Sequence, residues 1–412
     1  MATLTVKNVR IIDPVLNRSE TATLTVPVEG ADKTVDGEGL MAFPAFVDVH
    51  VHLRDPGFTE KETLDTGAAA ALHGGYGHIL AMANTKPVMT GGAIADFYAR
   101  AKALPLHAYT VSALTKDLKG EVLVDMEEAA RLGAVGFSDD GFPVDNMDLL
   151  KEGLLRAKAL DLPVSLHEED PAYVKKPGVD SRFAPAFGLK GAEAMAEYSL
   201  SARDLSLAHY LGAKLDIQHI SCALTARLVA AFAESGAEVL GEITPHHLTM
   251  TGDDVKTYTT LAKMNPPLRT AVDASDLAKF IGHENFCIAT DHAPHTAEEK
   301  NRSLKDAPSG ITGLETAFVL LYTELVLKDK CTLEDLIAAM TKIPADFYKL
   351  PHKGVAGGEF VLFDPEGETA VDEEFFRGKS HNSPLIGKTF KGKIKGICVK
   401  GKYHEFESEP PA

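Results

Sequence analysis

Two histidines lie two residues apart in the segment Asp48-Val49-His50-Val51-His52. Side chains alternate between the two faces of an extended strand, so His50 and His52 point the same way, about 7 Å apart along the strand. Two imidazoles on one face can hold a single metal ion from adjacent positions. Two histidines with this spacing are by themselves a weak signal, because most such histidines are surface or structural residues.

Further polar side chains strengthen the metal interpretation. Each of them stands at or just after the end of an apolar segment typical of a strand: Asp139, Asp140, His167, His219 and Asp291. The carboxyl ends of parallel strands in a barrel form one face, so these groups would converge there as nitrogen and oxygen ligands suited to zinc. Alternatively, each residue only satisfies polar groups at its own strand end. So many separate coincidences favour a metal site.

Six such ligands are too many for one tetrahedral ion and suit two ions that share a bridging carboxylate and a hydroxide. Two dications lower the pKa of the shared water, so that hydroxide exists near neutral pH. This chemistry supplies a nucleophile without serine or cysteine. In agreement, none of the four cysteines occupies a ligand position at a strand end: Cys222, Cys287, Cys331 and Cys398.

Strands and helices must alternate to position these groups, and the middle of the chain shows that alternation. We predict eight strands, at 45–52, 78–82, 106–111, 134–138, 162–167, 214–219, 238–243 and 286–290. Helical patterns lie between them, at 61–73, 122–132, 146–160, 191–211, 223–235 and 271–281. Eight strand–helix units predict an α/β fold, a (β/α)8 TIM barrel of the metallo-dependent hydrolase type, over residues 44–350.

The two chain ends have a different pattern. Residues 1–43 and 351–412 carry short β-type runs, and the second segment is rich in glycine. We predict that both ends form one small β-sandwich beside the barrel. Two unrelated β appendages are the alternative.

Composition restricts the class of protein. The chain has 412 residues, 45% hydrophobic residues and a net charge of −17. The acidic surface argues against nucleic acid or an anionic membrane as a partner. The amino-terminal residues do not resemble a signal peptide, no apolar run is long enough to span a membrane, and the cysteines form no paired motif. We therefore expect a cytoplasmic protein with a small-molecule substrate.

Taken together, the motifs resemble those of the amidohydrolase superfamily and, within it, of the class I dihydroorotases of bacterial type. The matching segments are FVDVHVHLRDPG, MANTKP, GFSDDG, HEED, QHIS, EITPHHL, KMNPPLR and IATDHAPH, with further similarity at PSGITGLETA and NSPLIG. Two positions depart from the common pattern, since Ala45 replaces a glycine and Ala83 replaces a proline. Neither change removes a ligand.

The resemblance implies a role for each ligand. Two zinc ions would be held by six side chains, three on the first ion, two on the second and one as a bridge: His50, His52 and Asp291; His167 and His219; and Asp140. Many relatives bridge with a carboxylated lysine, where this chain has aspartate. The resemblance also makes Asp291 the catalytic proton shuttle. It gives His246 and His247 no metal role.

Substrate contacts are implied as well. Arg54, with His52, Asn84 and His295, would bind a carboxylate, and Asn265 with Ser309-Gly310 would contact a ring. Taken singly, Arg54 could instead pair with Asp55, Asn84 could cap a turn, and His295 could be an ordinary loop residue. The polar segment 296–309 is expected to form a loop over the site, as a lid does.

The implied activity is the reversible interconversion of dihydroorotate and N-carbamoyl-aspartate in pyrimidine synthesis. One alternative is a hydantoinase- or allantoinase-like cyclic ureide hydrolase, which usually bridges its metals with carboxylated lysine. A second alternative is an inactive scaffold for a carbamoyltransferase, which would be expected to have lost ligands. A homodimer and an association of the active enzyme with a carbamoyltransferase both remain open.

Overall fold

The computed structural model describes residues 2–175 and 178–406. Its centre is made of short parallel strands in two sheets, with the orders β5-β6-β7 and β11-β10-β9-β8. Their bounds are Phe46–Val51 (β5), Tyr76–Ala81 (β6), His107–Thr110 (β7), Val164–Leu166 (β8), Leu215–Ile217 (β9), Val239–Ile243 (β10) and Phe286–Ile288 (β11). β5, β6 and β8 to β11 are buried along their whole length. Such runs are typical of a parallel sheet that is covered on both faces.

Three isolated bridges join these sheets into a closed ring. Phe137 pairs in parallel with Ser112, just after β7, and with Val164 in β8. At the other junction His292, which follows β11, pairs with Val51 in β5. The chain therefore forms the expected barrel, and the segment around Phe137 occupies the fourth strand position.

The expected strand at 134–138 is the main difference from the sequence prediction. Only Phe137 is bridged to both neighbours. The ladder with β8 cannot extend toward Val135. The Val135 carbonyl would have to accept a hydrogen bond from the backbone of residue 163, and Pro163 has no N–H to donate. Phe137 itself donates its N–H to the Pro163 carbonyl, 3.0 Å away.

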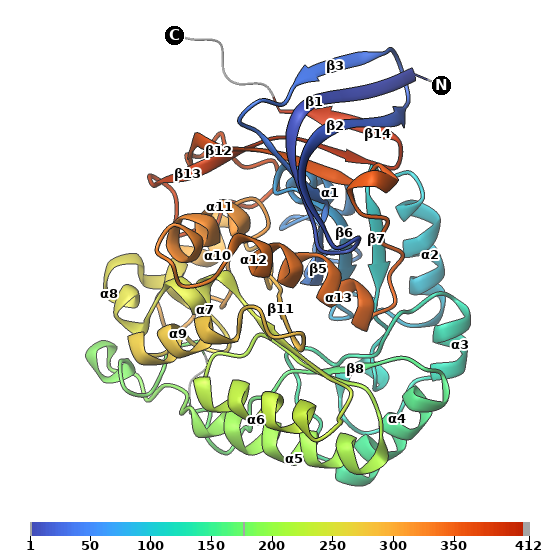
Figure 1. The fold of residues 1–412 in the computed structure, drawn as a ribbon. Coiled ribbons are helices and arrows are strands. Elements are labelled where there is room, and N and C mark those ends of the chain that lie inside the picture. Colours follow the sequence, from blue (N-terminus) through green and yellow to red (C-terminus); the bar gives the residue numbers. More distant parts are fainter. Residues whose placement is uncertain (1, 176–177, 407–412) are drawn as a thin grey trace.

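Helices surround the barrel (Figure 1). Six of them follow the predicted helical segments: Leu64–His73 (α1), Met126–Arg131 (α3), Met147–Ala159 (α4), Met195–Leu211 (α5), Ala223–Glu234 (α6) and Ala271–Leu277 (α9). α9 is shorter than expected because the chain tightens into a 3-10 turn over Ala278–Phe280. The helix α2 (Gly91–Ala101) was not among the predicted segments, and its two leading glycines weaken the helical signal.

Short helices complete the outer layer and the loops. They are Pro245–Thr249 (α7), Val255–Tyr258 (α8), Ala297–Lys300 (α10), Ala317–Leu321 (α11), Leu333–Met340 (α12) and Lys342–Phe347 (α13). α10 is a single turn in the 296–309 loop, capped by the Thr296 side chain. Within the described part of the chain, no helix has the length and apolar character needed to cross a bilayer.

Both chain ends contribute to one seven-stranded sheet at one end of the molecule (Figure 1). Its strands are Ala2–Asp13 (β1), Arg18–Val28 (β2), Lys33–Asp36 (β3), Met41–Pro44 (β4), Phe360–Ala370 (β12), Thr389–Val399 (β13) and Lys402–Glu405 (β14). β4 joins the two ends, because it pairs with β1 on one side and with β12 on the other. The two ends thus meet as we expected, while the description of this unit as a sandwich stays a prediction.

Candidate metal centre and active site

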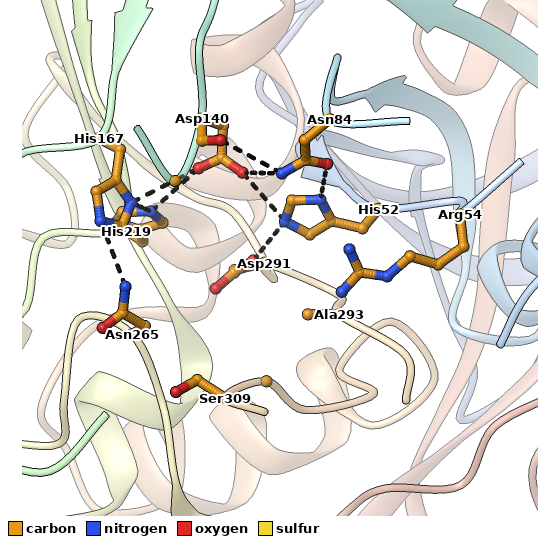
Figure 2. A pocket seen from close by; sticks show the side chains of 12 residues that line it. His52, Arg54, Asn84, Asp140, His167, His219, Asn265, Asp291, Ala293 and Ser309 are labelled. Atoms are coloured by element: carbon orange, nitrogen blue, oxygen red, sulfur yellow. Dashed lines mark hydrogen bonds and ion pairs between the residues drawn. The ribbon is translucent and has the colours of Figure 1, made fainter. Parts of the chain in front are cut away.

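A polar cavity of about 240 Å³ lies where the carboxyl ends of the barrel strands meet (Figure 2). Ten of the residues that the sequence singled out line it: His52, Arg54, Asn84, Asp140, His167, His219, Asn265, Asp291, Ser309 and Gly310. His50 is fully buried, and its imidazole packs against the rings of His52 and His219. His295 contacts Arg54. The structure therefore brings the six candidate ligands and the six further candidate substrate contacts close together.

The two histidines of β5 are oriented by groups on other strands. Nδ1 of His50 donates to Oε2 of Glu242, 2.7 Å away. Its Nε2 lies 3.6 Å from Asp140 Oδ1 and 3.7 Å from Asp291 Oδ1. That buried Nε2 has no hydrogen-bond partner among the described residues. A ring nitrogen aimed at two carboxylates and left without a bond is in the position of a metal ligand.

His52 points to the same conclusion by the direction of its hydrogen bonds. Asp140 Oδ2 can only accept, so the amide nitrogen of Asn84 must face it, at 2.9 Å. The amide oxygen of Asn84 then accepts from Nδ1 of His52 at 3.0 Å. In the neutral ring this leaves a lone pair on Nε2, which lies 3.1 Å from Asp291 Oδ1 and 3.4 Å from Asp140 Oδ2. A lone pair facing two carboxylates calls for a cation between them.

The two adjacent aspartates differ in surroundings. Oδ1 of Asp139 accepts from the backbone N–H groups of Leu114 and Thr115 at 2.8 and 2.9 Å, and Oδ2 accepts from the Thr115 hydroxyl. Asp139 is thus occupied in holding the loop after β7. Asp140 Oδ1 instead faces His50, His167 and His219, and Figure 2 shows its carboxylate between the histidines on both sides of the cavity.

His167 and His219 form the second half of the cluster. Nδ1 of His167 lies 2.9 Å from Nε2 of His219, and both atoms face Asp140. Nε2 of His167 donates to Glu169 Oε2 at 3.1 Å. Two imidazole nitrogens this close either share one proton or turn their lone pairs toward one ion. His167 directly follows β8 and His219 lies two residues after β9, and these two strands are neighbours in the barrel.

The donor atoms fit metal ions in type and in charge. Two groups of three have donor atoms within 4.8 Å of one another, namely His50, His52 and Asp291, and His50, Asp140 and His219. Burial raises the pKa of Asp140, but the imidazoles of His50, His167 and His219 outweigh it and hold this pKa well below its usual range. Asp291 is also held ionised, because His52 and His50 lower its pKa despite burial. Nearby carboxylates raise the pKa of His50 above its usual range and that of His167 to about 10 despite burial, so a bound cation would take the place of protons on these rings. Buried carboxylates and imidazole nitrogens are a suitable donor set for zinc.

Arg54 provides the positive charge of the cavity. Its Nε donates to the Pro294 carbonyl at 3.2 Å, and its Nη2 lies 3.4 Å from Nε2 of His295. Burial, together with the cations Arg54, Lys61 and Lys300, lowers the pKa of His295 to about 3, so this ring is neutral. Asp55, a candidate partner for Arg54, pairs with Arg100 instead. The guanidinium group therefore remains available to a ligand.

Asn265 and Ser309 lie across the cavity from Arg54 (Figure 2), and Gly310 also lines it. Nδ2 of Asn265 lies 3.5 Å from Nε2 of His167. The loop at Gly310 is tied down, because its N–H donates to the Lys263 carbonyl at 2.9 Å and its carbonyl accepts from Nζ of Lys300 at 3.0 Å. The cavity thus has a cationic side and a side that offers amide, hydroxyl and backbone groups.

Backbone strain also concentrates here. Arg54, His219 and Asp291 have positive φ angles of 57°, 34° and 47°. Residues other than glycine populate this region sparsely and are held there by their surroundings, often at functional sites.

Sequence reasoning missed two residues of this centre. Glu242 accepts from the ring of His50 and from the backbone N–H of His219, and Glu169 accepts from His167. The available signal for Glu242 was an acidic residue inside the otherwise apolar segment of β10. His247 is engaged with Thr244 and the Pro266 carbonyl, in line with its expected structural role.

Known proteins share this sequence over nearly its full length. The dihydroorotase of Clostridium acetobutylicum is 40% identical and covers 96% of this chain and 98% of its own. The dihydroorotase of Clostridioides difficile gives the same values, and that of Lactococcus lactis is 39% identical over 97% of this chain and 98% of its own. A family model described as Dihydro-orotase-like matches residues 39–224.

Solved structures share the fold. An L-hydantoinase (dihydropyrimidinase) from Arthrobacter aurescens has a TM-score of 0.87 at 23% identity, and the match covers 100% of this chain and 98% of that one. A dihydropyrimidinase from Brevibacillus agri NCHU1002 has a TM-score of 0.82 at 20% identity, covering 97% and 94%. At these identities the likeness concerns the fold alone. The sequence relationship goes further, and this chain belongs to the dihydroorotase family.

Proposed function

We propose that this chain catalyses the reversible hydrolysis of dihydroorotate to N-carbamoyl-aspartate, one step of pyrimidine synthesis. One observation carries the proposal: a cluster of histidines and aspartates converges on a cavity, and the Arg54 guanidinium group lines the same cavity. The histidines and aspartates suit metal-assisted hydrolysis of an amide, and Arg54 suits a substrate that bears a carboxylate.

The metal would be zinc, with two ions per chain. His50, His52 and Asp291 would hold one ion, His167 and His219 the other, and Asp140 would bridge them. The near contacts of Asp140 with imidazoles on both sides support its bridging position. When bound, such ions lower the pKa of a water molecule and polarise the carbonyl of a substrate.

The remaining side chains would orient the substrate and move the proton. Arg54, with His52, Asn84 and His295, would bind the carboxylate, since a guanidinium group offers two parallel N–H donors. Asn265 and the backbone at Ser309 and Gly310 would contact the ring from the opposite wall. The Asp291 carboxylate would accept a proton from the attacking water and deliver it to the ring nitrogen as the C–N bond breaks. The 296–309 loop would close over this site.

Substrate preference tests the proposal. Dihydroorotate, hydantoin and allantoin are assayed side by side with wild-type protein, with Arg54→Met and with the control Arg182→Met, whose guanidinium pairs with Asp180 outside the cavity. We expect turnover of dihydroorotate, and a rise in KM of about 10-fold or more in Arg54→Met, the size of a lost charge-assisted hydrogen bond. Arg182→Met should behave as wild type.

Activity on hydantoin or allantoin alone would instead favour the cyclic ureide hydrolase alternative. An unchanged KM in Arg54→Met would refute the carboxylate-binding role. The inactive-scaffold alternative is disfavoured because all six ligand side chains are present at the cavity. Zinc analysis of the purified protein tests it directly.

Other parts of the proposal concern organisation. We propose that residues 44–350 form the catalytic barrel. We also propose that residues 1–43 and 351–412 together form a small β-sandwich. A cytoplasmic location is supported by the cysteines, which are all free thiols. A homodimer and an association with a carbamoyltransferase stay predictions, and sedimentation of the holoenzyme alone and with the transferase tests both.

A further inference from the structure

We propose that His78, His107 and Glu359 form a second divalent-metal site, separate from the catalytic centre, which takes zinc or a similar transition metal. His78 in β6 and His107 at the start of β7 are cross-strand partners in the parallel ladder, so their side chains lie on the same face. Glu359 immediately precedes β12, and its carbonyl accepts from the N–H of Ala45 at 3.1 Å. The site therefore lies where the barrel meets the seven-stranded sheet.

The donor atoms are close enough for one ion. Nε2 of His78 lies 3.2 Å from Glu359 Oε2, and Nε2 of His107 lies 3.0 Å from Glu359 Oε1. Ligand atoms of a tetrahedral zinc, with bonds of about 2.0–2.2 Å, are about 3.3 Å apart. The three donor atoms all lie within 4.8 Å of one another. A small movement of the imidazoles would therefore place them around an ion.

The surroundings contain further groups of the kind that metal sites use. The ring of His352 lies 5.2 Å from that of His78, and its Nε2 donates to the Ala45 carbonyl at 2.9 Å. Its Nδ1 is buried and has no hydrogen-bond partner among the described residues, so it is an unused donor atom beside the cluster. The hydroxyl of Tyr109 lies 3.5 Å from Nδ1 of His78 and can hold that nitrogen in its protonated form.

A purely structural role explains less. In a metal-free clamp, the Glu359 carboxylate accepts one hydrogen bond from each of the two imidazoles. That arrangement leaves the buried Nδ1 of His352 unexplained, and it gives no reason for three imidazoles to gather in one place. Two imidazoles and one carboxylate are a zinc-type ligand set.

An ion can also reach the site. The side chain of His107 is 28% exposed, whereas those of His78 and Glu359 are almost fully buried. This partial exposure is typical of a structural metal site near the protein surface, at the boundary between two structural units. A bound ion would connect two barrel strands to the sheet built from the chain ends, and would stabilise the contact between them.

Metal content tests the proposal on untagged holoenzyme. The wild type, His107→Asn and the control His209→Asn, which alters an exposed histidine of α5, are freed of loose metal and analysed by mass spectrometry. We expect His107→Asn to hold one ion per chain fewer than the other two proteins, with its dihydroorotate turnover within about twofold of wild type. Glu359→Gln, which keeps the size of the side chain, should show the same loss.

A second measurement covers the case in which the variants fold poorly. Apoprotein of the wild type is titrated with Co²⁺, and the visible absorption of imidazole-bound cobalt is followed. Tight binding of one more Co²⁺ ion per chain than is needed to restore turnover supports the site. Equal metal content in wild type, His107→Asn and Glu359→Gln, or no cobalt uptake beyond the equivalents that restore turnover, would overturn it.

Discussion

Asp139 and Asp140 are consecutive residues whose carboxylates face different parts of the protein. Asp139 accepts three hydrogen bonds from Leu114 and Thr115, and Asp140 faces the histidines of the cavity. Of the two side chains, that of Asp140 is the one that lines the cavity. The pair therefore offers a matched comparison of a structural carboxylate and one that we propose binds metal.

We expect Asp140→Asn to lose at least one zinc ion per chain and most of its turnover, since it replaces an anion that faces three imidazoles. Asp139→Asn should keep its metal and lose about 1–3 kcal/mol of unfolding free energy, because a buried hydrogen-bond acceptor is lost. Zinc analysis and urea unfolding of both variants check this. If Asp139→Asn were the variant that lost metal, the assignment of the bridge would be reversed.

Glu242 should act through His50. Its Oε2 lies 2.7 Å from Nδ1 of His50 and also accepts from the backbone N–H of His219 at 3.1 Å. We expect Glu242→Gln to weaken metal affinity by about 10–100-fold, as is typical when the carboxylate that orients a ligating histidine is removed. Competition with a chelator measures the affinity. The control is Glu238→Gln, which alters an exposed residue directly before the same strand. Equal metal affinities of the two variants would contradict the role assigned to Glu242.

Asp291→Asn tests the proton shuttle. An amide keeps the size of the side chain but cannot accept a proton from the attacking water, so turnover should fall by about 10²–10⁴-fold, with the fold retained. Steady-state kinetics and circular dichroism check the two parts. Because Asp291 is also a proposed ligand, the variant is compared at saturating zinc. Turnover close to that of wild type under that condition would exclude the shuttle.

Lys300 should make stability depend on pH. Burial, with the nearby cation Lys263, lowers its pKa from 10.5 to about 7. Between these values the unfolded chain keeps a proton that native Lys300 has released, so this group makes the unfolding free energy rise with pH. The limiting slope is about 1.4 kcal/mol per pH unit, and below about pH 7 it disappears.

Urea unfolding between pH 7 and 9 measures this slope. Lys300→Met should flatten it, and Lys305→Met, which alters an exposed lysine of the same loop, should leave it as in wild type. Lys300 also donates to the carbonyls of Pro308 and Gly310, so Lys300→Met should be less stable at every pH. Equal slopes in the two variants would show that Lys300 keeps its proton throughout this range.

The sequence by itself determined the features that depend on local repetition. Alternation placed His50 and His52 on one face, buried apolar runs marked seven of the eight barrel strands, and polar residues at their ends indicated one metal-binding face. The fourth strand was predicted as regular, but Pro163 on the neighbouring segment limits it to a single bridged residue, Phe137. A missing donor on a partner strand cannot be recognised from the strand's own residues.

Only the tertiary structure decided how residues distant in the chain are paired. It placed Glu242 behind His50 across 192 positions of sequence, and it brought His78 and Glu359 together across 281. It also showed that Asp139 is occupied by backbone donors, where the sequence offered two equivalent aspartates. Local periodicity fixes which face a side chain occupies, but its partner depends on how the strands close into a barrel and how the chain ends pack against it.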